Sequence, residues 1–269
     1  MIGIFDSGLG GLITFKEIKK LLPKYSYIYL GDTLRSPYGG RSQEVVYEYT
    51  KNAVDFLFDK GCKLIVVACN TASSDALRKI QQEHLPKINN DKSKNILGVV
   101  RPLVEEAIDV SKTKRIGVVG TRATINSNVY GIELKNLDKN IKVFQKSCPL
   151  LVPLIEENWI KRPETKMILK KYIRELKDCN IDTLILGCTH YPILLNDFKN
   201  IMGHRINVLD SSKIIAEKLK IYLENHPEIE SGLEKNGKVE YLATDITENF
   251  EKMSQMILSK KVKFEKVKI

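Results

Sequence analysis

Short apolar segments alternate with longer amphipathic segments along most of the chain. The short segments are rich in Ile, Val, Leu and Tyr, as β-strands are, and the longer ones repeat their apolar residues at helical spacing. This alternation predicts parallel β-sheets covered by helices. The segments expected to form strands are, in order, IGIFD, YIYLGD, KLIVVAC, ILGVV, RIGVVG, KVFQKSC, TLILGC and INVLD.

Two of the predicted strands, 64–68 and 184–187, are apolar at every position rather than at every second one. Continuous apolar runs are typical of strands that are buried on both faces. Near the end of the chain, YLATDITENFEKMSQMIL predicts a strand and then a helix, with Asp245 as N-cap and Glu248 completing a capping box. The polar, turn-rich segments 84–96 and 224–238 are expected to form loops.

An internal repeat relates the two halves of the chain at an offset of 119 residues, the separation of Cys69 and Cys188 (188 − 69). Each copy predicts a helix, a left-handed cap at Gly61 or Asn180, a buried strand, a small residue and a cysteine. A weaker match pairs IGIFDSG with IGVVGTR. The repeat predicts an α/β fold of two similar lobes, each a mostly parallel sheet covered by helices, with an active site in the cleft between them. The matched pairs are Leu57 with Leu176, Ile65 with Leu184, Val66 with Ile185, Val67 with Leu186, and Ala68 with Gly187.

Length and charge add modest constraints. A chain of 269 residues is long enough for two domains. The formal net charge of +10 suits an anionic partner, but Lys166, Lys170, Lys171 and Lys177 lie at helical spacing between apolar residues, which predicts a solvated helix face rather than a nucleic-acid surface. No segment has the length and apolarity of a membrane span, and no signal peptide is evident, so we expect a cytoplasmic protein without a membrane partner.

Five cysteines are distributed without a CxxC pair or the spacing of a zinc site, so neither a disulfide framework nor a structural metal is expected. Cys69 and Cys188 differ from the others because each directly follows a buried strand and precedes a predicted helix start. Helix N-termini stabilise thiolates, so both thiols are expected to ionise below about 8.5, the free value, and to act as bases. We interpret the other three, Cys62, Cys148 and Cys179, as structural.

Polar residues gather at three of the predicted strand ends. They are Asp6 and Ser7, Asn70 and Thr71, and Thr189 and His190. Each has an ordinary structural explanation, such as helix capping by Asp6 or Ser7 and carbonyl binding by His190. Ligands of open α/β sheets bind beyond the carboxyl ends of the strands, so together these residues indicate a functional site.

Six segments carry a resemblance to a known family. They are IGIFDSGLGG, GDTLRSPYG, VVACNTAS, GVVGTRAT, CPLLVPLIE and LILGCTHYPIL. Through them the sequence resembles the glutamate racemases of the aspartate/glutamate racemase superfamily over nearly the whole chain. Departures from the family pattern are minor: Ser74 stands where Ala is commoner, and Gly187 before Cys188 is unremarkable.

The resemblance implies that Cys69 and Cys188 are the two proton donors and acceptors, with Asp6 assisting the first and His190 the second. It also implies two lobes that exchange chain ends, with residues 1–97 and 208–269 in the lobe of Cys69 and residues 98–207 in the lobe of Cys188. The substrate-binding residues that it implies are Asp6, Ser7, Tyr38, Gly39, Asn70, Thr71, Thr189 and His190, with Pro37, Thr121, Thr124 and Glu156 as further positions near the site.

The activity implied by the resemblance is cofactor-independent conversion of L-glutamate to D-glutamate, which supplies bacterial peptidoglycan synthesis. Racemisation needs a base on each face of the Cα atom, and two cysteines can provide them. The sequence shows no phosphate cradle or isolated active-site lysine for a pyridoxal cofactor, and GLGG does not complete a dinucleotide motif. The substrate is then a small molecule, glutamate; no nucleic acid is required, and a homodimer is compatible with the resemblance.

Three alternatives remain open from the sequence. An aspartate or hydantoin racemase would share both cysteines and differ in the groups that hold the side-chain carboxylate. A thiol redox or metal-binding module predicts a disulfide or bound zinc, which thiol titration and metal analysis would detect. A basic binding module predicts salt-dependent retention by DNA.

Overall fold

The first lobe contains a six-stranded sheet, and its backbone follows the sequence pattern closely. The computed structural model describes residues 1–89 and 93–269. Every strand pairing in this sheet is parallel, in the order β10-β9-β2-β1-β3-β4. Its strands are β1 (Ile2–Asp6), β2 (Tyr27–Gly31), β3 (Leu64–Val67), β4 (Asn95–Gly98), β9 (Val239–Ala243) and β10 (Glu265–Lys266). Its helices include α1 (Gly11–Leu21), η1 (Tyr38–Gly40), α2 (Gln43–Asp59), α3 (Asn70–Asp75), α4 (Leu77–Lys79), η2 (Ile80–His84), α5 (Leu85–Ile88), α12 (Ser211–Asn225), α13 (Pro227–Glu230) and α14 (Glu248–Leu258).

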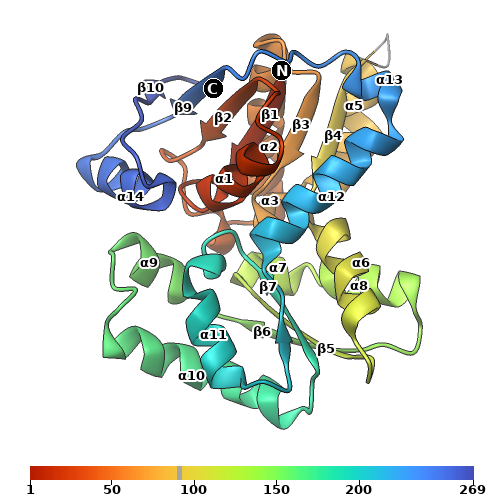
Figure 1. The fold of residues 1–269 in the computed structure, drawn as a ribbon, viewed down its shortest axis with the longest axis vertical. Coiled ribbons are helices and arrows are strands. Elements are labelled where there is room, and N and C mark those ends of the chain that lie inside the picture. The colour runs from red at the N-terminus through yellow and green to blue at the C-terminus, as the bar shows by residue number, and fades with distance from the viewer. Residues whose placement is uncertain (90–92) are drawn as a thin grey trace.

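The second lobe contains a four-stranded parallel sheet in the order β6-β5-β7-β8. Figure 1 shows this sheet below the first, with both chain ends in the upper lobe and α12 near the junction. The strands are β5 (Arg115–Gly120), β6 (Lys142–Ser147), β7 (Thr183–Gly187) and β8 (Asn207–Val208). The helices are α6 (Val100–Val110), α7 (Arg122–Asn126), α8 (Val129–Leu137), α9 (Leu151–Glu156), α10 (Pro163–Asp178), η3 (Tyr191–Leu194) and α11 (Leu195–Met202).

The two sheets repeat one topology, which confirms the predicted α/β fold of two similar lobes. The order β2-β1-β3-β4 in the first lobe corresponds to β6-β5-β7-β8 in the second. Cys69 therefore follows β3 and Cys188 follows β7, each beside the strand that opens its lobe. The predicted boundaries at 97/98 and 207/208 stay a prediction; β4 ends at Gly98 and β8 at Val208, one residue past each of them.

The caps that precede these two strands are alike. Gly61, after α2, has φ +85°, and Asn180, after α10, has φ +52°. Only Gly and, at some cost, Asn adopt this left-handed conformation readily, and it turns the chain from the helix into the strand. The capping residues predicted from the repeat are thus confirmed.

The strand that carries Cys69 is buried on both faces. In β3, Leu64 and Val66 join the core cluster that includes Phe15 of α1, and Ile65 and Val67 join the cluster on the α2 side. Each such side chain contributes about 1.5–3 kcal/mol by leaving water. Helices on both faces thus fix the strand ends, and with them the positions of the residues that follow.

Several local expectations were wrong. The N-cap of α14 is Thr247, whose hydroxyl accepts from the Phe250 N–H, whereas Asp245 pairs with Lys266. Helical turns interrupt both predicted loops, since residues 84–88 are helical and α13 lies within 224–238. Residues 90–92 of the first loop lie outside the described residues.

The expected solvated helix face is present on α10, where the four lysines singled out in the sequence are exposed beside a buried apolar stripe. Within residues 1–89 and 93–269, no helix is long and apolar enough to span a bilayer.

Candidate active site

A cavity of about 210 Å³ is lined by residues that follow strands of both sheets, and it contains both Cys69 and Cys188. Eleven residues singled out from the sequence form part of its wall. They are Ser7, Pro37, Tyr38, Gly39, Cys69, Asn70, Thr71, Thr121, Cys188, Thr189 and His190. The carboxyl ends of the two sheets thus face one small space, as expected for α/β folds.

The remaining three predicted residues lie directly behind this wall. Asp6 is fully buried, and its Oδ2 accepts from the Gly8 N–H at 3.0 Å. Thr124 is 3.3 Å from the Thr71 hydroxyl, and Glu156 is 3.1 Å from His190. The structure therefore brings the whole predicted set together, with these three one contact away from the cavity.

Cys69 is held by the start of α3 and by the loop after β1. Its sulfur accepts from the Ala72 N–H at 3.5 Å, so Cys69 serves as the N-cap of α3. On the other side the thiol donates to the Ser7 hydroxyl at 3.3 Å. These contacts fix the sulfur at the cavity wall.

Cys188 begins a chain of polar contacts. Its sulfur is 3.9 Å from His190 Nδ1, and the other ring nitrogen, Nε2, is 3.1 Å from Glu156 Oε1. The side-chain amide of Asn249, on α14 of the first lobe, donates to the backbone carbonyl of Glu156 at 3.0 Å. The first lobe thus helps to hold Glu156 in place. An imidazole between a carboxylate and a thiol has one fixed orientation and can carry a proton beside the sulfur.

Glycines allow the two lobes to approach closely around the cavity. A Cβ atom at Gly10 would lie 2.3 Å from the Thr189 hydroxyl, and one at Gly39 would lie 2.6 Å from the Cβ of Thr121. Real Cβ atoms essentially never show such distances, so both positions require glycine. GLGG therefore serves close packing of α1 against the second lobe.

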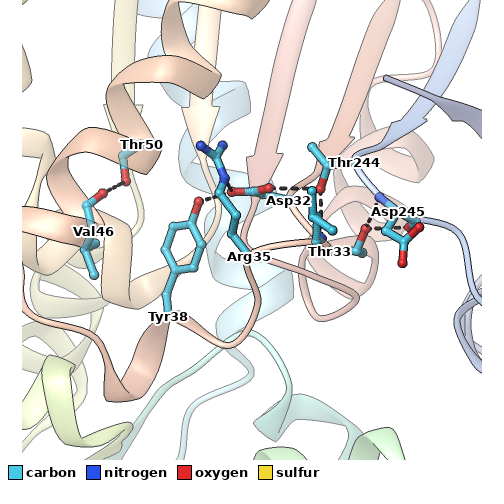
Figure 2. Close-up of polar contacts among 9 residues, drawn as sticks. Asp32, Thr33, Arg35, Tyr38, Val46, Thr50, Thr244 and Asp245 are labelled. Atoms are coloured by element: carbon cyan, nitrogen blue, oxygen red, sulfur yellow. Dashed lines mark hydrogen bonds and ion pairs between the residues drawn. The ribbon is translucent and has the colours of Figure 1, made fainter. Parts of the chain in front are cut away.

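The loop 36–40 is held in place by Asp32, which Figure 2 shows between Arg35, Tyr38 and Thr244. Arg35 Nε donates to Asp32 at 2.6 Å, and the Thr244 hydroxyl donates at 2.9 Å. The Tyr38 hydroxyl also donates to Asp32. The hydroxyl proton of Tyr38 is therefore already engaged by Asp32, while the residue lines the cavity.

A larger cavity, about 1080 Å³, lies elsewhere, lined by α4, α6, α8 and α12 among other elements. None of the residues predicted to be catalytic or substrate-binding lines it. The chemistry-bearing residues are therefore in the smaller cavity, which we treat as the candidate active site.

Known proteins match the chain over its full length. The family model described as Asp/Glu/Hydantoin racemase matches residues 15–219. The chain belongs to this family. A glutamate racemase of Sulfurihydrogenibium sp. is 45% identical over 269 residues, covering 100% of this chain and 97% of the relative.

Solved structures of glutamate racemases have the same fold as this chain. A glutamate racemase isoform from Bacillus anthracis has a TM-score of 0.91 at 35% identity, covering 100% of this chain and 97% of that one. The glutamate racemase from Francisella tularensis, solved in complex with D-glutamate, has a TM-score of 0.86 at 31% identity and covers 99% and 97%.

The electrostatics of the first thiol in this racemase-family chain differ from expectation. Burial, and then the nearby charge of Asp6, raise the pKa of Cys69 to about 12, although hydrogen bonds with Ser7 and Ala72 oppose this. The stabilisation of the thiolate by the N-terminus of α3 is smaller than the cost of burying its charge. The expectation of a lowered pKa was therefore wrong for Cys69. The thiol form of Cys69 is favoured at neutral pH.

His190 shows the opposite balance. Burial lowers its pKa, but hydrogen bonding to Cys188 and Glu156, together with their negative charges, raises the pKa to about 10. The imidazole is therefore protonated at neutral pH and places a positive charge beside Cys188.

The Asp6 carboxyl is buried on the Cys69 side of the cavity, and its charge acts on the Cys69 thiol. Burial raises its pKa, opposed by the charge of His190 and by hydrogen bonds from Gly11, Gly8 and Thr189. Its Oδ1 is buried without a hydrogen-bond partner among the described residues. Burial thus raises the pKa of both the Asp6 carboxyl and the Cys69 thiol on this side of the cavity.

Sequence reasoning missed several residues of this family member's cavity wall. Cys148 lines the cavity although its position suggested a structural role, and its carbonyl accepts from the Tyr191 hydroxyl at 3.0 Å. Arg122 adds a basic residue to the wall. Both residues lie inside segments that match the family, and this match could have identified them as wall residues. The other missed wall residues are Ser36, Gly40, Pro149, Val152 and Pro153.

Replacing Asp32 by Asn should destabilise the protein by about 3 kcal/mol, because three donors would then face an amide in place of a buried carboxylate. Asp245→Asn is the matched control, since it removes an exposed ion pair with Lys266. Urea unfolding should show a lower midpoint at unchanged slope for Asp32→Asn and little change for Asp245→Asn. Equal midpoints for the two variants would contradict the role given to Asp32.

Proposed function

We propose that this protein interconverts L- and D-glutamate by proton transfer at Cα, with Cys69 and Cys188 as the two bases. The observation that carries the proposal is that both thiols line one small cavity while belonging to different sheets. A racemase must remove a proton from one face of a carbon and deliver one to the other, so it needs groups on two sides. Two sheets that end at a common space supply them.

The two thiols have different surroundings. Cys69, whose pKa is about 12, rests as the thiol, and Cys188 lies 3.9 Å from His190, whose pKa of about 10 keeps the imidazole protonated. In one direction the Cys188 thiolate takes the Cα proton, and the Cys69 thiol donates its own proton to the opposite face. The pair then holds the reverse assignment until it exchanges protons with solvent or turns over the product.

The carbanion formed at Cα needs stabilisation through the neighbouring carboxylate. Hydroxyls of Ser7, Thr71 and Thr189 and the amide of Asn70 lie in the cavity wall and can donate to carboxylate oxygens. The backbone at Tyr38 and Gly39 lies at the loop side of the cavity. These residues would bind the substrate, with Pro37, Thr121 and Thr124 shaping the wall.

Asp6 and Glu156 act behind the thiols in this proposal. Asp6 is buried on the Cys69 side, and Glu156 bonds the far nitrogen of His190 at 3.1 Å. Glu156 thereby favours the imidazolium form of His190 beside Cys188. Both carboxyls set proton positions without contacting the reacting carbon.

We propose that the reaction needs no cofactor, and the residues of the cavity wall support this. No lysine is present among the described residues that line the cavity, so a Schiff base with a pyridoxal group has no anchor there. Two thiols and a set of hydrogen-bond donors are what the site offers.

Glutamate is favoured over aspartate by the relatives. The matches at 45% and 35% identity are glutamate racemases, and the Francisella enzyme at 31% identity was solved with D-glutamate. A ligand one methylene shorter would leave carboxylate donors of the wall unpaired, which costs more than lost apolar contact.

We further propose that the enzyme works in the bacterial cytoplasm and supplies D-glutamate for peptidoglycan. Its substrate is a small molecule, so the positive charge of +10 requires no nucleic-acid partner, and the exposed lysines of α10 are accounted for as a solvated helix face. A homodimer is compatible with this function, since each chain carries both thiols.

Purified, dialysed protein given L-glutamate should produce D-glutamate, as measured by chiral chromatography, until both forms are equal. L-aspartate should react at least tenfold more slowly. Strict dependence on pyridoxal phosphate would contradict the mechanism, and faster turnover of aspartate would contradict the substrate.

Cys69→Ser and Cys188→Ser should each abolish racemisation, because a serine hydroxyl is far less acidic than a thiol and neither base can reach the other face. Cys62→Ser is the matched control, since Cys62 is also buried but lies behind Gly3, away from the cavity. If either cavity variant kept more than about a tenth of wild-type turnover, a barrier change under about 1.4 kcal/mol, that cysteine would not be a base.

A further inference from the structure

One side chain of the second lobe reaches the residue that follows Cys69. Tyr130, on α8, is fully buried, and its hydroxyl is 2.6 Å from Asn70 Oδ1 at the start of α3. The bond crosses between the lobes and joins α8 to the start of α3, where Asn70 lines the cavity. Nothing in the pattern of the sequence pointed to Tyr130, because an aromatic residue in an apolar helix is ordinary core.

The ring of Tyr130 also rests on the strand that carries Cys188. A Cβ atom at Gly187 would lie 3.1 Å from the ring and 2.9 Å from the carbonyl of Val119 on β5. Gly187, which looked unremarkable in the sequence, therefore makes the space that the ring occupies. Tyr130 thus touches the residue before one thiol and the residue after the other.

The bond determines which way the Asn70 amide faces. A buried tyrosine hydroxyl needs an acceptor, and the Asn70 oxygen is the only one recorded for Tyr130 in residues 1–89 and 93–269. With its oxygen turned to Tyr130, Asn70 must direct its NH₂ group the other way. No protein acceptor binds that nitrogen within the described residues, and Asn70 lines the cavity.

We propose that Tyr130 is a positioning residue that fixes the Asn70 amide so that its two N–H donors face a substrate carboxylate in the cavity. The inference rests on the proposed function for the identity of that carboxylate. Without the hydroxyl, the amide can rotate and present its oxygen, which repels a carboxylate. Tyr130 acts through Asn70 and does not touch the substrate.

A second contact holds the same end of α3 and keeps the effect of Tyr130 local. The Thr71 hydroxyl lies 3.0 Å from that of Thr121 and 3.3 Å from that of Thr124, both in the second lobe. Loss of the Tyr130 hydroxyl therefore leaves the helix in place and frees only the amide.

A double-mutant cycle tests the proposal with Tyr130→Phe, Asn70→Ala and the double variant. Tyr130→Phe should lower kcat/KM for glutamate about tenfold, more through KM than through kcat, and the double variant should be no worse than Asn70→Ala. Tyr27→Phe is the matched control: Tyr27 is equally buried, and its hydroxyl donates to the Leu22 carbonyl, away from the cavity. Its activity should stay within twofold of wild type.

Additive losses, or wild-type kinetics for Tyr130→Phe, would overturn the proposal. A loss in kcat alone, together with a lower unfolding midpoint, would show a merely structural role and overturn it as well. Wild-type protein that does not racemise glutamate would instead refute the proposed function.

A measurement without substrate tests the role of Tyr130 independently of whether the protein racemises glutamate. The NH₂ resonances of the Asn70 side chain, assigned by their absence in Asn70→Ala, should shift in Tyr130→Phe and stay unchanged in Tyr27→Phe. Unchanged resonances in Tyr130→Phe would overturn the inference whatever the substrate is.

Discussion

The structure depends on one constraint: for two thiols to reach opposite faces of one carbon atom, as the proposed function requires, they must come from two sheets whose strand ends face the same cavity. A single sheet presents its strand ends along one edge, so its side chains approach a ligand from one side. Here the topology is duplicated, and Cys69 and Cys188 follow corresponding strands of two sheets. The glycines at the lobe contacts, such as Gly10 and Gly39, let these edges close on one cavity.

Duplication of the backbone does not make the two sides electrostatically equal. On the Cys69 side burial raises the pKa of the Cys69 thiol and of the Asp6 carboxyl, and the Cys188 side has a protonated His190. This asymmetry places a neutral thiol on one side of the cavity and a cation on the other. It arises from residues that differ between the repeats rather than from the strands that they share.

The backbone could be predicted from the sequence because apolar runs and caps are local signals, whereas cavity-wall residues such as Tyr38 and Thr121 came only from the family resemblance. The strand of Cys69 and the left-handed caps at Gly61 and Asn180 are examples. The pKa of Cys69 was predicted in the wrong direction, since burial depends on packing between lobes that no segment encodes alone. The role of Tyr130 could not be predicted for the same reason, because Asn70, which its hydroxyl contacts, lies 60 residues away in the other lobe.

Solvent isotope incorporation tests the two-base geometry most directly. In D₂O at early times, each enantiomer formed should carry deuterium at Cα while recovered substrate carries little, starting from either hand. The reason is that the thiol that donates on the product face has exchanged with solvent before turnover. A single base that serves both faces would return the original proton to part of the product. Substantial protium in newly formed product would contradict separate roles for Cys69 and Cys188.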